Sequence, residues 1–194
     1  MKRAEQAVET RAALIEAAKR QFAARGYLNT KITDITAEAG RAAGSFYRHF
    51  ASKEELLQAL LAELAAASDT YADAEGHKSD FTDPDAIRYH VTACWRVYRD
   101  HAPTMLALRQ AALVSEDFAR TFDQFRRAQL ADLADHLEHV QNLPASPGTT
   151  LTLMSALLEA PAQLGPGMPE EEAVEVTTRF LYRALNGKDY APGA

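Results

Sequence analysis

Apolar residues recur every three to four positions along most of the chain, which is the spacing of an amphipathic helix. No segment alternates apolar and polar residues in the β-branched pattern typical of strands. The first apolar stripe, between residues 10 and 25, consists of Ala13, Leu14, Ala17, Ala18, Phe22 and Ala23. The pattern therefore predicts an all-α fold of about nine helices without a sheet.

Glycines and capping residues mark the ends of four N-terminal helices. Gly26 and Gly40 are expected to end the first two, because glycine tolerates the left-handed conformation that follows a helix. Thr30 and Ser52 are expected to cap the second and fourth by accepting a bond from a free backbone N–H. Ser52 also stands three residues before Glu55, the spacing of a capping box. These signals predict helices over residues 10–25, 32–40, 43–50 and about 52–68.

The remainder continues as helices separated by loops and breaks. Residues 73–83 are polar and predict a loop, and Asp83-Pro84 pairs a capping residue with proline at the first helical position. Prolines and glycines interrupt the chain at residues 144–148 and 165–169. These signals predict helices over residues 84–101, 103–113, 115–142, 149–163 and 169–186. The chain after Gly187 is expected to be loosely ordered.

Charge is distributed unevenly along the 194 residues. The net charge is −6, yet residues 1–55 hold ten Lys/Arg against seven Asp/Glu, a net of +3, and the rest carries −9. A mildly basic head on an acidic body fits a protein that presents one end to a polyanion. No apolar run approaches the roughly 20 residues that span a bilayer, and the start lacks a signal-peptide core. We therefore expect a cytoplasmic protein with no membrane partner.

The two short helices joined by a tight turn form a helix-turn-helix pattern at about residues 31–50. Such a unit places its second helix in the major groove of DNA. That helix begins with small residues that permit close approach, and Ser45 offers a hydroxyl to a base or phosphate. Tyr47 and His49 are long enough to reach phosphates, and Lys53 adds a cation in the first turn of the next helix. Phe46 and Phe50, spaced i, i+4, are interpreted as core anchors rather than DNA contacts.

These residues resemble the DNA-binding domain of the tetracycline-repressor (TetR) family over about residues 8–68. The matching pattern reads Gly26-Tyr27-x-x-Thr30-x-Ile32-x-Asp34-Ile35-x-x-x-Ala39-Gly40-x-x-x-Gly44-x-Phe46-Tyr47-x-His49-Phe50-x-Ser52-Lys53-x-x-Leu56. The resemblance implies a homodimeric, all-helical repressor of double-stranded operator DNA. It also implies that the last two helices form the dimer interface.

The resemblance divides the chain into a DNA-binding domain, residues 8–68, and a ligand-binding and dimerisation domain, residues 69–187. The residues expected to face DNA are Thr30, Lys31, Thr33, Arg41, Ala42, Ala43, Gly44, Ser45, Tyr47, His49 and Lys53. The turn departs from the family's usual Gly-Val-Ser, since Arg41 replaces the apolar residue and Ala42 the capping hydroxyl. Arg41 has two interpretations, a contact to phosphate or guanine and a solvated side chain.

The body contains aromatic residues suited either to a plain core or to a pocket for a lipophilic or aromatic effector. Ligand pockets combine apolar walls with a few polar groups. The expected pocket residues are Tyr89, His90, Cys94, Trp95, Tyr98, Met105, Arg109, Phe118 and Phe122. Cys94, the single cysteine, is read either as a small buried residue or as a sensor thiol. Arg109 either pairs with an acidic group or extends to water.

Asp132, His136 and His139 would share one face of the helix predicted over residues 115–142. One helix supplies too few ligands for a closed zinc site, so these residues are interpreted as a solvated face and no metal is expected. The sequence contains no Gly-rich phosphate loop, nucleophile elbow or H-E-x-x-H motif. Neither catalysis nor a cofactor is expected.

Three hypotheses about the function are compatible with the sequence. The first is a DNA-binding repressor released by a small molecule, with activation left open. The second is a helical interaction module whose head binds protein, and the third is a helical enzyme. Salt-dependent binding to DNA beside the protein's own gene would separate the first from the second, and turnover of a bound metabolite would support the third.

Overall fold

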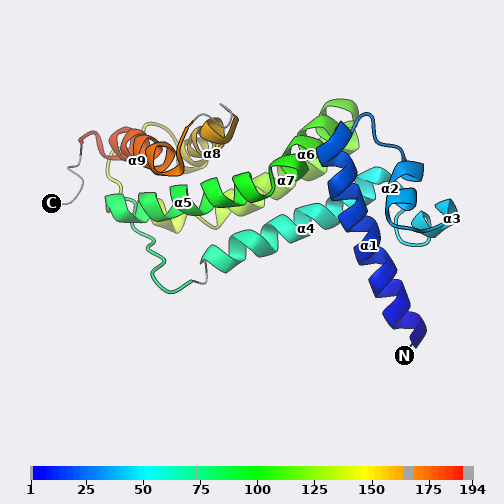
Figure 1. Ribbon diagram of the computed structural model, residues 1–194. Coiled ribbons are helices and arrows are strands. Elements are labelled where there is room, and N and C mark those ends of the chain that lie inside the picture. The colour runs from blue at the N-terminus through cyan, green and yellow to red at the C-terminus, as the bar shows by residue number, and fades with distance from the viewer. Residues whose placement is uncertain (1, 73, 164–167, 190–194) are drawn as a thin grey trace. The chain divides into compact units, whose positions relative to one another are not determined.

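The computed structural model describes residues 2–72, 74–163 and 168–189, and these residues form nine α-helices, one 3-10 helix and no strand. The all-α prediction is therefore confirmed. The helices, labelled in Figure 1, are α1 Lys2–Arg25, α2 Ile32–Glu38, α3 Ala43–Phe46, α4 Lys53–Ala72, α5 Pro84–Asp100, α6 Ala102–Val114, α7 Glu116–Ala131, the 3-10 helix η1 Asp135–Leu137, α8 Pro147–Gln163 and α9 Glu170–Asn186. None of these helices is long and apolar enough to cross a membrane.

Two compact units divide the chain. The first contains the described residues up to 64 together with 101–124, and the second contains 65–100 and the described residues from 125 onward. Helices α4 and α7 each contribute to both units. The division predicted between residues 68 and 69 stays a prediction about function, because compactness does not define which helices bind DNA.

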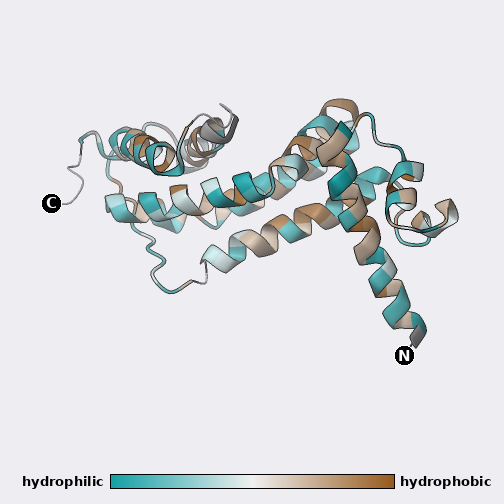
Figure 2. Ribbon diagram, viewed as in Figure 1, coloured by the Kyte–Doolittle hydropathy of each residue, from teal (hydrophilic) through white to brown (hydrophobic). Residues whose placement is uncertain are grey.

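In the first unit, α1 packs against α2 and α6, and α2 packs against α3. The predicted stripe on α1 is confirmed at Leu14, Ala17, Ala18 and Phe22, which are all buried. Helix α1 begins eight residues earlier than predicted, at Lys2. Its first turns are rich in Ala, Glu and Arg, which are good helix formers and need no apolar face. Figure 2 shows hydrophilic colours over much of these turns.

A residue from α6 completes the turn that follows α1. Gly26 ends α1 with a φ of +76°, as its position predicted. The backbone N–H of Tyr27 then donates to the Gln110 side-chain oxygen at 2.8 Å. This contact joins residues 83 positions apart within the first unit, so the turn into the helix-turn-helix depends on α6.

Thr30 does not cap α2, contrary to the prediction. Lys31 is the N-cap residue, and its backbone N–H donates to the Asp34 carboxylate at 2.9 Å. The Thr30 hydroxyl instead donates to the Gly26 carbonyl at 2.7 Å, and only 1% of the residue is exposed. The predicted cap of α4 is confirmed, because Ser52 Oγ accepts a bond from the Glu55 N–H at 3.3 Å.

Helix α7 ends at Ala131, eleven residues before the predicted end at 142. The chain then turns through η1, where His136 and Leu137 are buried, and Val140 is buried just after it. The His136 carbonyl accepts a bond from the Phe81 N–H at 3.0 Å. In a continuous helix this carbonyl would instead accept a bond from an N–H of the helix itself. The predicted solvated face is therefore wrong for His136, which is 4% exposed, although Asp132 and His139 are exposed.

The second unit is built around α5, which packs against α8 and α9. Asp83 caps α5 as predicted, since its carboxylate accepts a bond from the Asp85 N–H at 2.8 Å. The buried cluster consists of Phe81, Ala86, Ile87, Val91, Leu137, Val140, Leu151, Met154, Val174, Leu181, Tyr182 and Leu185. Trp95 lies partly buried against it.

Candidate DNA-binding site

The turn between α2 and α3 is fixed by two hydrogen bonds. The Gly40 N–H donates to the Ala37 carbonyl at 3.0 Å, and the Arg41 N–H donates to the Thr36 carbonyl at 2.8 Å. This pair of bonds is a Schellman motif, in which the residue after the helix adopts positive φ. Gly40 has a φ of +63°, so glycine is the residue that this turn requires.

Helix α3 is shorter than predicted, because it ends at Phe46 rather than at Phe50. The chain continues in turns, in which the His49 and Phe50 N–H groups both donate to the Phe46 carbonyl at 2.9 Å. As the sequence predicted, Ala42 stands at the N-cap without a side-chain bond, which leaves the first N–H groups of α3 to another acceptor. A phosphate oxygen is an acceptor of the required kind.

Two phenylalanines anchor α3 and the turns after it in the core of the first unit. Phe46 is fully buried and Phe50 is 2% exposed, and their ring centroids lie 5.5 Å apart. Their burial confirms the interpretation of both as core anchors. Tyr47 lies edge-on to Phe46 but is 63% exposed, so the segment presents the tyrosine to solvent.

The predicted DNA-facing residues divide by exposure. Those exposed on α2, the turn and α3 are Lys31, Thr33, Arg41, Ala42, Ala43, Gly44 and Tyr47, and His49 is partly exposed. Thr30 and Ser45 are buried, Ser45 at 4% exposure, so neither hydroxyl lies at the surface of this structure. Their assignment to DNA contact stays an untested prediction.

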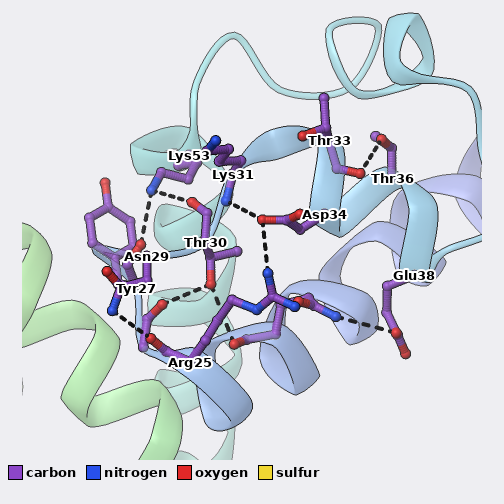
Figure 3. A network of polar contacts seen from close by, with 12 residues as sticks. Arg25, Tyr27, Asn29, Thr30, Lys31, Thr33, Asp34, Thr36, Glu38 and Lys53 are labelled. Atoms are coloured by element: carbon purple, nitrogen blue, oxygen red, sulfur yellow. Dashed lines mark hydrogen bonds and ion pairs between the residues drawn. The ribbon is translucent and has the colours of Figure 1, made fainter.

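Lys53 is held inside the first unit by three contacts, shown in part in Figure 3. Its Nζ donates to the Thr30 carbonyl at 2.7 Å and to the Tyr27 carbonyl at 3.0 Å. It also lies 4.0 Å from the centre of the Tyr27 ring. Burial lowers the pKa of Lys53 below its usual value. The lysine thus ties the start of α4 to the turn before α2, a role that the sequence did not reveal.

Some cations on this surface pair with carboxylates and others do not. Arg20 pairs with Glu38 at 2.6 Å and Arg25 pairs with Asp34 at 3.3 Å. Lys31, Arg41 and Arg48 are exposed and have no ion pair among the described residues. Sequence reasoning overlooked Arg48, although an arginine beside Tyr47 in the second helix was a visible signal. Three cations without carboxylates favour a polyanionic partner.

The predicted pocket residues fall into two groups. Tyr89, His90, Cys94, Trp95 and Tyr98 lie on α5 in the second unit, whereas Met105, Arg109, Phe118 and Phe122 lie in the first unit. Phe118 and Phe122 are buried and stack with ring centroids 6.3 Å apart, as core residues do. That all nine form one pocket stays a prediction.

Two of the predicted pocket residues on α5, Cys94 and Trp95, carry polar groups in unusual surroundings. Burial, assisted by the Glu159 carboxylate, raises the pKa of the Cys94 thiol to about 12. A thiol that stays protonated is a poor nucleophile, which favours the structural reading of Cys94. The indole N–H of Trp95 is buried and has no hydrogen-bond acceptor among the described residues.

Comparisons with known proteins agree with this geometry. Residues 14–60 match the family model described as bacterial regulatory proteins, tetR family. The transcriptional regulator TtgR of Pseudomonas putida is 46% identical over 80 residues, which are 41% of this chain and 38% of TtgR. The transcriptional repressor KstR2 of Mycobacterium tuberculosis is 49% identical over 51 residues, 26% of each chain. Each match thus spans less than half of the relative's length.

The fold is similar to solved structures over most of the chain. A TetR-like transcriptional regulator from Rhodococcus sp. RHA1 superposes with a TM-score of 0.71, at 20% identity, over 92% of this chain and 97% of that one. At this identity the likeness shows the fold, and the sequence matches show the DNA-binding segment. Residues 14–60 thus match the tetR family of bacterial regulatory proteins in sequence, and the chain shares the fold of a TetR-like regulator over most of its length.

Proposed function

We propose that this protein is a cytoplasmic transcriptional repressor that binds operator DNA as a homodimer and is released by a small lipophilic or aromatic molecule. The observation that carries the proposal is the surface of α2, the turn and α3, where Tyr47 is exposed and the exposed Lys31, Arg41 and Arg48 have no carboxylate partner among the described residues. The names of its relatives support regulation of transcription rather than catalysis, and KstR2 is named a repressor.

The geometry supports entry of α3 into the major groove. Ala43 and Gly44 are exposed at the start of this helix and carry little or no side chain, so the backbone can approach the bases. The uncapped N–H groups of α3 and the Tyr47 hydroxyl are donors for phosphate oxygens. Lys53 acts beneath this surface by positioning the turn before α2.

Arg41→Ala tests the DNA surface. If Arg41 contacts a phosphate, affinity should fall similarly for all DNA sequences, and the slope of log K against log salt should fall by about 1. If Arg41 reads a guanine, discrimination at one base pair should fall by about 1–3 kcal/mol. The measurement is fluorescence anisotropy with DNA from beside the protein's own gene and with random duplex, across a salt series.

The matched control is Lys188→Ala, which also removes one positive charge, from an exposed residue that follows α9 in the second unit. It should leave both affinity and salt slope unchanged. Equal effects of the two substitutions would show a general charge effect and remove Arg41 from the site.

The predicted dimer helix α9 has two apolar faces. Ala173, Val174, Leu181 and Leu185 are buried within the second unit, so the face of α9 that carries them belongs to the core. Val176 and Phe180, spaced i, i+4, are 53% and 62% exposed. Leu153 of α8 is also exposed at 55%. These side chains supply the apolar surface that the proposed homodimer would bury.

Phe180→Glu should dissociate this dimer, because a carboxylate buried in an apolar interface lacks a partner. We expect a loss of at least about 2 kcal/mol, roughly 30-fold in the dimer Kd. Analytical ultracentrifugation at micromolar concentration measures the change. Leu113→Glu, at an 83% exposed position of α6, is the control and should remain dimeric. Dissociation of the control alone would place the interface elsewhere.

The α5 group supports the proposed effector site. Trp95, Tyr89 and Tyr98 are partly exposed aromatic residues on one helix, and the Trp95 N–H offers a donor that no described group uses. An apolar surface with one unsatisfied polar group fits a lipophilic molecule that carries an acceptor. The four predicted residues of the first unit remain part of the proposal on sequence grounds.

A further inference from the structure

Three histidines converge in the second unit from three separate segments. His77 lies in the loop after α4, His90 on α5 and His136 in η1. One ring nitrogen from each lies within 4.8 Å of the other two. The chain has six histidines, so half of them meet at one point although 59 residues separate the first from the last.

The ring of His136 is oriented by its neighbour in the chain. Its Nδ1 lies 2.6 Å from the Asp135 carboxylate, to which the Nδ1–H donates, so the lone pair is on Nε2. Histidines that bind metals are commonly held in this way by a carboxylate on the other nitrogen. The Asp135 side chain is itself exposed, although the His136 ring that it binds is buried.

One pair of ring nitrogens already has the spacing expected at a metal ion. His136 Nε2 lies 3.2 Å from His77 Nε2. Two imidazoles bound to one tetrahedral zinc at about 2.0–2.1 Å place their nitrogens about 3.3 Å apart. The third ring, His90, has its centroid 4.8 Å from that of His136 and 5.1 Å from that of His77.

Aromatic side chains pack against these imidazoles. Phe81 packs against His90 and His136 with centroids 5.2 and 5.0 Å away, and Tyr89 lies beside His77 at 5.7 Å. A hydrophobic shell of this kind controls the access of solvent to a bound ion.

A hydrogen bond between His77 and His136 is the simpler reading of the 3.2 Å contact. It accounts for His77 and His136, while His90 Nε2 lies 3.3 Å from the Lys78 carbonyl, and a bond to this carbonyl leaves the lone pair of His90 on Nδ1. We propose that His77, His90 and His136 bind a divalent transition-metal ion, Zn²⁺ in the first instance, with a fourth position open to water or another ligand. Three imidazoles suit zinc, copper, nickel or iron better than the hard ions magnesium and calcium.

The experiment uses the full chain, freed of metal by a chelator and titrated with Co²⁺, whose tetrahedral complexes absorb visible light. We expect one Co²⁺ per chain with intense visible bands, and displacement of the cobalt by Zn²⁺. Thermal unfolding should shift upward in Zn²⁺, since an ion that binds the folded state stabilises it. No visible bands together with no shift in Tm would overturn the proposal.

Variants localise the site. His77→Gln should abolish the bands, and because His77 is partly exposed in a loop, circular dichroism can verify that this variant folds. Asp135→Asn should weaken metal affinity by about 10–100-fold by releasing His136 from its orientation. His139→Gln, an exposed histidine three residues from His136, is the matched control and should bind as the parent does. Binding that survives His77→Gln, or that falls equally in the control, would assign the metal to adventitious surface contacts.

Discussion

Replacing Phe46 by alanine should lower the free energy of unfolding of the helix-turn-helix by about 3–5 kcal/mol, the range measured for buried phenylalanines. The ring is fully buried and packs against Phe50 at 5.5 Å. Helix α3 has four residues, too few for intrinsic stability, so its position depends on this contact. DNA binding should be lost with it.

Tyr47→Ala is the matched control, because it truncates the adjacent aromatic residue at a 63% exposed position. It should change stability by no more than about 0.5 kcal/mol and still weaken DNA binding. Hydrogen exchange of residues 32–50 measures local stability, and anisotropy measures binding. If Phe46→Ala leaves exchange unchanged, Phe46 does not anchor α3.

Phe81→Ala should have an effect of similar size, about 3–5 kcal/mol, in the second unit. Phe81 lies outside any helix, yet it is fully buried in the cluster around α5. Its N–H donates to the His136 carbonyl at 3.0 Å, and its carbonyl accepts a bond from the Asn186 side chain at 3.0 Å. The buried ring and these two bonds of its backbone together hold the loop before α5 against η1 and the end of α9.

Trp95, the single tryptophan, packs against this cluster, so urea titration followed by its fluorescence reports on the second unit. Phe81→Leu, which keeps most of the apolar volume, should recover most of the loss. A Phe81→Ala midpoint equal to that of the parent would mean that the loop is not part of the cooperative core.

Local signals predicted the fold where one residue decides the conformation. Gly26, Gly40, Ser52 and Asp83 each end or begin a helix as expected, because left-handed backbone and capping bonds depend on nearby atoms. The failed prediction for α7 has a distant cause. The end of α7 depends on the bond between Phe81 and His136, which lie 55 residues apart in number, and helical periodicity carries no information about it.

The candidate site, like the fold, was predictable where nearby residues decide the structure. The exposure of Arg41, Gly44 and Tyr47 agrees with a surface role, since the spacing of Phe46 and Phe50 fixes which face is buried. Lys53 was not predictable in this way. Its ammonium serves backbone carbonyls of a preceding turn, and a carbonyl leaves no trace in the residue type. The histidine cluster was missed because its members come from three segments that are distant in the sequence.

The bond between Gln110 and the Tyr27 N–H has a consequence for recombining regulators of this kind. A chimaera cut after α4 would graft residues 1–72 onto a foreign body and lose the acceptor that completes the turn after Gly26. Residues 101–124 belong to the same compact unit and would have to travel with the head. The segment exchangeable between relatives is therefore discontinuous in sequence, and a recipient that lacks a carboxamide at the equivalent of Gln110 would need it installed.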